Sequence, residues 1–420
     1  MSADADSPAD DAEAPLAAGE RIVALDVLRG FALLGIFIMN MPAFSHSIFT
    51  LPEVPPGVLD ALLLALREIL FAGKFNLLFC LVFGIGFAIQ MARLDSAEAA
   101  RAARVGVAPR RHRATQVYAR RLAFLFVVGL VHAMLLWSGD VLLIYAMVGF
   151  VLLALRRLGD RALYVLIAAC LVFPALTDAL RAALVGRGFE TVATFQYEQL
   201  HASNDLAYGR GSFLDAMRET ARVFDWSWRS PVGLFVYASF FVQMATGILI
   251  GFVVGRRGWP RRPLADRSAE RRAPRTALMA AIGCGLVEVI AFAWSCEVGV
   301  FVSAFARTLG RASLAACYAL LVVRFVRDHP AELPPWLQPL RDAGRMPLSN
   351  YLLQTALATF IFHGWGLGWW NSVGPAGEIA LAIVLFVAVQ LPLSHVWLKR
   401  FRYGPLEYLW RRFTYGSAPG

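Results

Sequence analysis

Long apolar stretches alternate with short polar segments along most of the chain, a pattern typical of proteins with several transmembrane helices. A helix rises about 1.5 Å per residue, so roughly 18 or more apolar residues are needed to cross about 30 Å of hydrocarbon. Ten stretches approach or meet this length and predict an all-α fold, a polytopic bundle of transmembrane helices. The predicted spans lie near 23–41, 75–92, 121–137, 141–156, 162–180, 233–255, 276–296, 299–326, 347–364 and 376–398.

A shorter apolar segment at 58–72 leaves the number of spans open between ten and eleven. It falls short of the usual spanning length and contains Arg67 and Glu68, and ionisable groups are costly at mid-membrane. We therefore interpret it as an interfacial or re-entrant helix. If it spans instead, the amino terminus moves to the other side of the membrane.

Arginines are distributed unevenly among the connections between the predicted spans. Eight arginines fall in 93–121 and eight in 256–275, and further basic residues lie in 156–161, 324–345 and 399–412. With ten spans, all five segments face the same side, which the positive-inside rule assigns to the cytoplasm. We therefore expect a multi-pass membrane protein with both termini in the cytoplasm.

Composition supports this interpretation, because 58% of residues are hydrophobic and only 17% are charged, too apolar a balance for a soluble core. The net charge of +10 resides in short loops, so nucleic acid is not an expected partner but the lipid bilayer is. The cysteines lie in or next to apolar stretches without metal-ligand spacing, and we expect packing residues and no metal site: Cys80, Cys170, Cys284, Cys296 and Cys317.

The chain is expected to form one transmembrane domain over 21–416. Residues 1–20 are rich in acids, alanine and proline and lack a basic n-region, so they predict a disordered tail and no cleavable signal peptide. Residues 184–232 are the one long connection expected on the external side. Its aromatic run, Phe224 to Trp228, fits an interfacial belt better than a sugar-binding platform, although both interpretations remain open.

Polar side chains within predicted spans are the best candidates for function, because each is costly in hydrocarbon unless it faces the bundle interior. In the first span, Asp26 and Arg29 are three residues apart and can pair on one helix face. Asn40 follows on the same face, and His46 lies where the chain should emerge outside. A purely structural ion pair with an interhelical amide is the alternative interpretation.

Further polar residues are expected at the external side or in the bundle interior. His132 and Asp140 are eight residues apart around a short outer turn, where the histidine can equally make a structural hydrogen bond and the acid can cap the next helix. Lys74 opens the second span, and Asn350 and Gln354 share a helix face. For His363, an interfacial role is the favoured interpretation. No P-loop, GxGxxG, HExxH or GxSxG motif occurs in a suitable context.

Five segments, in order, resemble the YeiB family of bacterial membrane proteins, whose function is unknown. They are LDVLRGFALLGIFIMN, KFNLLFCLVFGIGFAIQ, RRLAFLFVVGLVHAMLLWSGDVLLIYAMVG, GRMPLSNYLLQT and FRYGPLEYLWRRFTYG, and the resemblance runs from about Arg21 to Gly416. It implies a membrane-embedded architecture and leaves the chemistry open.

The first segment is also similar to the LDxLRG opening of transmembrane acyltransferases, both the heparan-glucosaminide acetyltransferases and the acyltransferase-3 proteins. This more distant resemblance implies transfer of an acyl group from cytoplasmic acyl-CoA to a glycan or lipid acceptor. Acyltransferase-3 proteins have an essential histidine eleven positions after the arginine, where this chain has Asn40. The heparan-glucosaminide acetyltransferases have asparagine at this position and their catalytic histidine further on, which points to His46 in this chain. In this respect the chain departs from the acyltransferase-3 pattern.

Two functions are therefore carried forward. The favoured one is an acyltransferase that uses acyl-CoA as a substrate and has no tightly bound cofactor, with His46 or His132 as general base and Asp140 orienting it. Substrate binding would then fall to Asp26, Arg29, Asn40, Lys74, Asn350 and Gln354. The alternative is a transporter or flippase for a small solute or lipid headgroup, although no clear inverted repeat is visible in the sequence.

Overall fold

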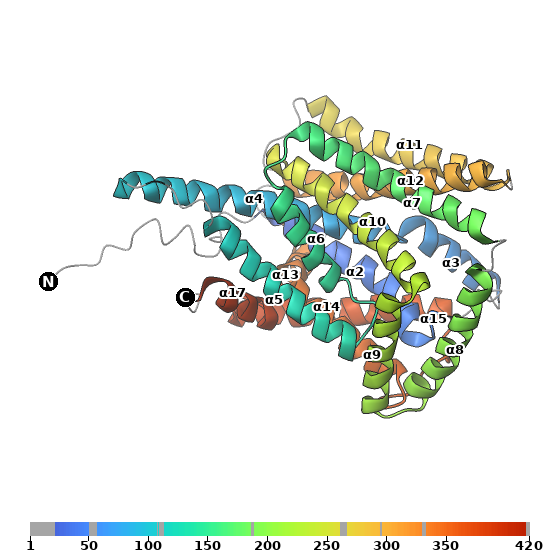
Figure 1. Ribbon diagram of the computed structural model, residues 1–420. Coiled ribbons are helices and arrows are strands. Elements are labelled where there is room, and N and C mark those ends of the chain that lie inside the picture. Colours follow the sequence, from blue (N-terminus) through green and yellow to red (C-terminus); the bar gives the residue numbers. More distant parts are fainter. Residues whose placement is uncertain are drawn as a thin grey trace.

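The computed structural model describes residues 22–49, 57–106, 108, 113–185, 189–260, 267–294, 296–329 and 333–416, and over these ranges the fold is all-α with no strand, as predicted. The predicted tail 1–20 lies outside the described residues. Figure 1 shows the arrangement of the helices. They are α2 (Val23–Ser45), α3 (Val58–Leu70), α4 (Lys74–Val105), α5 (Arg113–Leu135), α6 (Leu142–Leu155), α7 (Asp160–Val185), α8 (Phe189–Gly209), α9 (Phe213–Arg229), α10 (Pro231–Arg256), α11 (Arg267–Phe292), α12 (Glu297–Arg327), α13 (Gln338–Arg345), α14 (Pro347–Phe362), α15 (Pro375–Val384), α16 (Leu391–Arg400) and α17 (Pro405–Tyr415), with short turns η2 (Pro335–Leu337) and η3 (Leu385–Gln390).

Each of the ten predicted spans coincides with a helix, but not all are long enough to cross a bilayer. Within the described ranges, eight helical stretches have the length and apolar composition for it. Helices α6 and α14 have 14 and 16 residues, or about 21 and 24 Å of rise, short of about 30 Å of hydrocarbon. The architecture is that of a multi-pass helical membrane bundle, and the count of ten spans stays a prediction.

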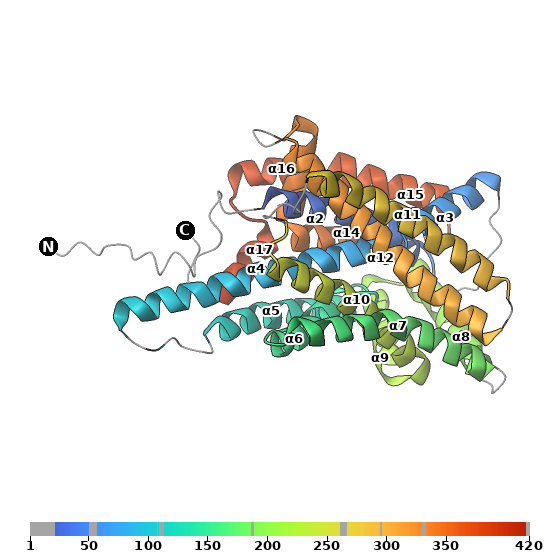
Figure 2. The same cartoon turned by 90° about the horizontal axis from the view of Figure 1, so that it is seen from above.

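The helix ends that border the arginine-rich connections lie at one end of the bundle, which we call the arginine-rich end. In Figures 1 and 2, the C-terminal ends of α4, α10 and α12 lie there together with the N-terminal ends of α2, α5 and α11. This arrangement agrees with the alternation predicted from the positions of the arginines. Helix α4 also projects beyond its neighbours at this end, because its alanine-rich second half continues the helix to Val105, past the predicted boundary at residue 92.

The segment 58–72 forms the separate helix α3. Gly73 has a φ angle of +73°, which breaks the chain direction between α3 and α4. None of the residues of α3 is fully buried. Its Asp60 carboxylate accepts a hydrogen bond from the backbone N–H of Ala376 at the start of α15 (3.1 Å). Helices α3 and α4 together form one apolar stretch from Val58 to Val105, and the interfacial or re-entrant placement of α3 stays a prediction.

The predicted external loop 184–232 is mostly helical, because it contains the hairpin of α8 and α9. Ser212 begins α9 with a capping box in which its side chain and that of Asp215 bond each other's backbone N–H groups. The aromatic run packs inside the protein in part: Trp226 lies against Phe49 (5.4 Å between ring centroids), and Trp228 lies against Tyr237 of α10 (5.2 Å). These rings anchor the hairpin at the end opposite the arginines.

Helix α2 lies in the core and is held closely by α13. A Cβ atom on Gly344 would lie 1.8 Å from the backbone oxygen of Asp26, and one on Gly30 would lie 2.0 Å from the backbone oxygen of Leu340. The two helix backbones can therefore touch only because both positions are glycine. This contact places the Asp26 region of α2 beside the C-terminal end of α13.

The five cysteines are all free thiols, and Cys80 and Cys317 are buried.

Candidate functional site

A cavity of about 250 Å³ lies between α2, α4, α5, α6, α13, α14 and α17. Its lining on α2 extends from Leu25 to Ile36, which corresponds to about 17 Å along the helix axis. The cavity therefore reaches from the arginine-rich end to about the middle of the bundle. Its two ends differ in chemistry.

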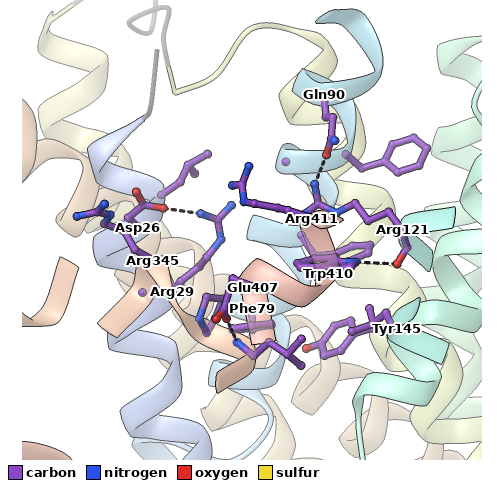
Figure 3. A pocket seen from close by; sticks show the side chains of 18 of the residues that line it. Asp26, Arg29, Phe79, Gln90, Arg121, Tyr145, Arg345, Glu407, Trp410 and Arg411 are labelled. Atoms are coloured by element: carbon purple, nitrogen blue, oxygen red, sulfur yellow. Dashed lines mark hydrogen bonds and ion pairs between the residues drawn. The ribbon is translucent and has the colours of Figure 1, made fainter. Parts of the chain in front are cut away.

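The end nearest the helix termini is rich in cations. Five arginines line it together with the carboxyl groups of Asp26 and Glu407. Figure 3 shows side chains from α2, α5 and α17 converging on this region. The arginines are Arg29, Arg93, Arg121, Arg345 and Arg411.

Asp26 and Arg29 form the ion pair that their spacing predicted. The Arg29 guanidinium donates to the Asp26 carboxylate across 2.6 Å. The arginine side chain keeps 26% of its surface exposed and lines the cavity. Arg345, at the end of α13, is held 3.3 Å from the buried carboxylate of Asp342. The close contact between α2 and α13 thus brings two guanidinium groups to the same wall.

Helix α17 closes another wall through a cluster around Arg121. Arg121 donates to the side-chain oxygen of Gln90, and its guanidinium lies 4.0 Å from the ring centroid of Trp410. The indole N–H of Trp410 donates to the backbone oxygen of Arg121 (2.8 Å), and Gln90 donates to the hydroxyl of Tyr415 (3.1 Å). Figure 3 shows the contacts of Arg121 with Gln90 and Trp410, which join α4, α5 and α17.

Glu407 of α17 caps the N-terminus of α14. Its Oε1 accepts from the backbone N–H groups of Leu348 (2.8 Å) and Ser349 (3.1 Å), and its Oε2 accepts from the Ser349 hydroxyl (2.6 Å). A carboxylate is favourable there because the first N–H groups of a helix lack intrahelical partners. Burial nevertheless raises the pKa of the Glu407 carboxyl above its ordinary value of 4.5, with the hydrogen bonds partly offsetting this effect.

The far end of the cavity is apolar and aromatic. Phe79 and Phe83 of α4 contact the ring of Tyr145 on α6, at 5.6 and 5.7 Å between centroids. The thiol of Cys80 donates a hydrogen bond to the hydroxyl oxygen of Tyr145 (3.4 Å). Tyr351 of α14 completes this end. The cavity as a whole therefore combines an arginine-rich end with a hydrophobic interior.

A buried hydrogen-bond network lies directly behind the apolar end. His132 Nδ1 is 2.8 Å from Asp140 Oδ1, and His132 Nε2 is 3.0 Å from the hydroxyl oxygen of Thr355. The hydroxyl of Tyr351 lies 3.4 Å from Asp140 Oδ1. Asp140 also caps α6, because its Oδ2 accepts from the backbone N–H of Leu143 (2.7 Å). Asp140 thus contacts His132 and caps α6, and its role in orienting a catalytic base stays a prediction.

His46 lies in a second polar cluster, near the end opposite the arginines. Its Nδ1 is 3.2 Å from Glu378 Oε1 and 3.0 Å from the Ser45 hydroxyl, which itself donates to Glu378. Arg67 of α3 approaches the other oxygen of Glu378 (3.6 Å). Glu378 is buried, whereas 36% of the His46 side chain is exposed. The carboxylate partner of His46 is therefore Glu378, while Asp140 contacts His132.

Asn350 and Gln354 lie in an interhelical network and do not line the cavity. Asn350 donates to Ser394 (2.9 Å), Gln354 donates to Gln390 (3.0 Å), and Gln390 donates back to the backbone oxygen of Asn350 (2.9 Å). Gln390 belongs to η3, a π-helical turn between α15 and α16. π-helical turns are frequent at functional sites. Here, however, the side-chain amide of Gln390 makes its hydrogen bonds with Asn350 and Gln354 of α14.

The remaining candidates lie apart from the cavity. The Lys74 ammonium donates to the backbone oxygen of Glu68 across 2.6 Å and stabilises the turn between α3 and α4. Asn40 is half-buried on α2, outside the cavity lining. His363 stacks on Tyr208 of α8 with centroids 4.8 Å apart. In the described ranges, no three histidine, cysteine or acidic side chains gather as metal ligands.

Several residues of the site were missed by the sequence analysis. Arg121 lies at the boundary between a predicted loop and a predicted span, and Glu407 and Trp410 lie in the basic C-terminal segment. Nothing in the sequence indicates that these two segments are close in space. Glu378 carried a usable signal, since it is an acid within a predicted span, where such groups are costly unless they have a partner. Nothing in the sequence distinguishes Tyr351 from the other aromatic residues of the predicted spans.

The chain is similar to proteins without an assigned function. Residues 254–417 match a family model described as protein of unknown function (DUF418). The chain is 28% identical to the uncharacterised protein YxaH of Bacillus subtilis (96% of each chain covered) and 28% identical to the uncharacterised protein YeiB of Escherichia coli (95% of this chain and 97% of the relative). No solved structure matches it. These similarities confirm the resemblance that the five ordered segments indicated: residues 254–417 resemble the DUF418 family, and almost the whole chain resembles YxaH and YeiB.

Proposed function

We propose that the protein is a membrane-embedded acyltransferase that moves an acyl group from cytoplasmic acyl-CoA to a glycan or lipid acceptor of the cell envelope. The observation that carries the proposal is the two-sided cavity, with five arginines at one end and an apolar interior at the other. An acyl-CoA has the complementary form, an anionic phosphate-bearing head joined to a long, less polar arm that ends in the thioester.

The arginine end suits the phosphates of the donor. Guanidinium groups bind phosphate oxygens through paired N–H donors. Arg29, Arg121 and Arg411 approach this space from three different helices (Figure 3), so a ligand with several phosphate groups could contact more than one of them. Trp410 and Tyr415 line the same end and offer aromatic surfaces for the adenine ring.

The apolar end suits the thioester and its acyl chain. The donor would enter from the arginine-rich end and extend along α2 to the wall formed by Tyr145 and Tyr351. Behind that wall, the His132–Asp140 pair has the arrangement of a general base with an orienting carboxylate. His132 would take the proton of the acceptor hydroxyl through the Thr355 hydroxyl that contacts its Nε2, as the acceptor oxygen attacks the thioester carbon and the C–S bond breaks.

His46 with Glu378 is the second candidate for the base. Its ring is more exposed than that of His132 and lies near the other end of α2. We assign the base to His132 because Tyr351 and Val141 connect its network directly to the cavity lining.

The proposal places the arginine-rich end in the cytoplasm of a bacterial cell and the protein in the inner membrane. Labelling of cysteines by a membrane-impermeant maleimide tests this orientation. The native thiol of Cys296 is exposed between α11 and α12 and should react in intact cells. A Val105→Cys variant carrying Cys296→Ser should react only after permeabilisation, and reaction in intact cells would reverse the orientation.

Turnover in nanodiscs tests the reaction itself. Purified protein is supplied with radiolabelled acetyl-CoA, a lipid extract of bacterial envelopes and octyl glucoside as a soluble sugar-bearing acceptor. Label should pass to an acceptor in the wild type, and Arg121→Gln should raise the KM for the donor. If no label is transferred, and the same protein in sealed liposomes moves a lipid or solute across the bilayer, the protein is a transporter and the proposal is wrong.

A further inference from the structure

We propose that Tyr351 is the general acid of the acyl transfer, the group that gives a proton to the departing thiolate. This inference rests on the proposed acyltransferase function and adds a catalytic residue to it. Tyr351 projects from α14 into the apolar end of the cavity, where the thioester would lie. Its hydroxyl is the group of this wall that connects to the His132–Asp140 pair.

The Tyr351 hydroxyl lies between the cavity and the buried His132–Asp140 network, and this position supports the role. It lies 3.4 Å from Asp140 Oδ1 and accepts a hydrogen bond from the backbone N–H of Val141 (3.3 Å). The side chains of His132, Asp140 and Thr355 belong to the same network, but Tyr351 is the one of the four that lines the cavity. A ligand in the cavity can therefore exchange a proton with this network through the phenol.

Acyl transfer needs such an exchange for its proton balance. Attack by an acceptor hydroxyl forms a C–O bond and releases one proton, while cleavage of the C–S bond leaves a thiolate that takes up one proton. The base and the acid of the reaction can therefore be the two ends of one relay. His132 receives the proton of the acceptor, Tyr351 protonates the thiolate, and the phenolate recovers its proton from His132 through Asp140. No other reactant is consumed.

The relay follows contacts that already exist. The step from His132 to Asp140 spans 2.8 Å and the step from Asp140 to Tyr351 spans 3.4 Å. Thr355 is buried and holds the remaining nitrogen of His132 at 3.0 Å, so the proton of the acceptor reaches the ring only through the Thr355 hydroxyl. The longer Tyr351 contact would shorten when a donor fills the cavity, as often happens at catalytic hydrogen bonds on substrate binding.

Tyr145 provides a matched control for Tyr351. It lines the same end of the cavity and is fully buried, yet its hydroxyl contacts the thiol of Cys80 and not Asp140. Tyr145→Phe therefore removes a hydroxyl from the same wall without interrupting the relay. Tyr351→Phe removes only the hydroxyl at its own position and keeps the aromatic packing.

The test compares two acetyl donors that differ in the acidity of the leaving thiol. Acetyl-CoA leaves as an alkyl thiolate, which needs a proton. The acetyl thioester of 5-thio-2-nitrobenzoate leaves as an acidic aryl thiolate, which does not. The rate of donor consumption is measured in nanodiscs with the envelope lipid extract and octyl glucoside, for wild type, Tyr351→Phe and Tyr145→Phe.

Tyr351→Phe should lower kcat for acetyl-CoA by about 100-fold, the usual size of a general-acid contribution, and should change kcat for the aryl donor by less than about 3-fold. Tyr145→Phe should affect both donors equally. An equal loss with both donors in Tyr351→Phe would overturn the inference and leave the acyltransferase function standing. A wild type that consumes neither donor would instead overturn the proposed function.

Discussion

Nδ1 of His132 lies 2.8 Å from Oδ1 of Asp140, and the two side chains are 1% and 0% exposed. Such a pair is costly to bury unless each group has its hydrogen bonds made. Here Leu143, Tyr351 and Thr355 supply the remaining partners. The pair is thus a fixed polar unit at the apolar end of the cavity.

The first prediction concerns Asp140. In Asp140→Asn, the side chain keeps an oxygen for the cap of α6 but cannot hold His132 in the same tautomer or stabilise its protonated form. We expect kcat for acyl transfer to fall by about 100-fold or more with little change in the melting temperature.

His46→Ala is the comparison for this variant. It removes the histidine of the other cluster and should leave kcat within a few-fold of the wild type. If His46→Ala abolishes turnover and Asp140→Asn does not, the base is His46 with Glu378, and the relay through Tyr351 is wrong.

A second prediction treats Asp26 and Arg29 as one unit. Arg29→Ala leaves the buried Asp26 carboxylate without its 2.6 Å ion pair, which we expect to cost about 1–3 kcal/mol of unfolding free energy. The double variant Asp26→Ala with Arg29→Ala should recover part of this stability, because no buried charge loses its partner. Additive losses in a double-mutant cycle measured by denaturant unfolding would show that the pair has no coupling.

The third prediction concerns the backbone contact between α2 and α13. An added Cβ in Gly344→Ala would lie 1.8 Å from the backbone oxygen of Asp26, so the helices must separate, at a cost of about 1–3 kcal/mol. The separation would also move Arg345 relative to Arg29 and raise the KM for the donor.

Gly283→Ala on α11 is the matched control, because no atom lies within 4 Å of its added Cβ. Alanine is favoured over glycine in a helix by about 1 kcal/mol, so this variant should be as stable as the wild type or slightly more. Equal stability of the two alanine variants would contradict the close packing of α13 on α2.

The fourth prediction is a pH dependence from Glu407. Because burial raises the pKa of its carboxyl above 4.5 in the folded protein, the folded state favours the protonated form. The resulting stabilisation is fully present below the unfolded pKa and is lost as pH rises through the raised folded pKa. Glu407→Gln cannot titrate, so the melting temperature of the wild type relative to this variant should fall as pH rises above 4.5. A difference that stays constant, or grows with pH, would contradict this account.

Local features of the site could be predicted from the sequence because they depend on residues close in the chain. The three-residue spacing of Asp26 and Arg29 fixes them on one helix face, and the short turn between His132 and Asp140 brings those side chains together. The all-α fold followed from the length of the apolar stretches. The shared end of the arginine-rich connections followed from their alternation along the chain.

Features that depend on distant segments could not be predicted in this way. Glu407 caps α14 across 58 residues of chain, and Trp410 contacts Arg121 across 289. Neither pair has a spacing that a helical period can reveal. The span count is uncertain for a different reason: α6 and α14 are apolar throughout but short, and apolar composition alone does not distinguish a short buried helix from a full span.

The central claim is that acyl-CoA occupies the two-sided cavity, and a structure of the protein in nanodiscs with a non-hydrolysable thioether analogue of acetyl-CoA tests it most directly. We predict density for the phosphates against Arg29, Arg121 and Arg411 and for the thioether sulfur beside the hydroxyl of Tyr351. A map at a saturating concentration of the analogue in which the cavity is empty or filled by lipid would contradict the account.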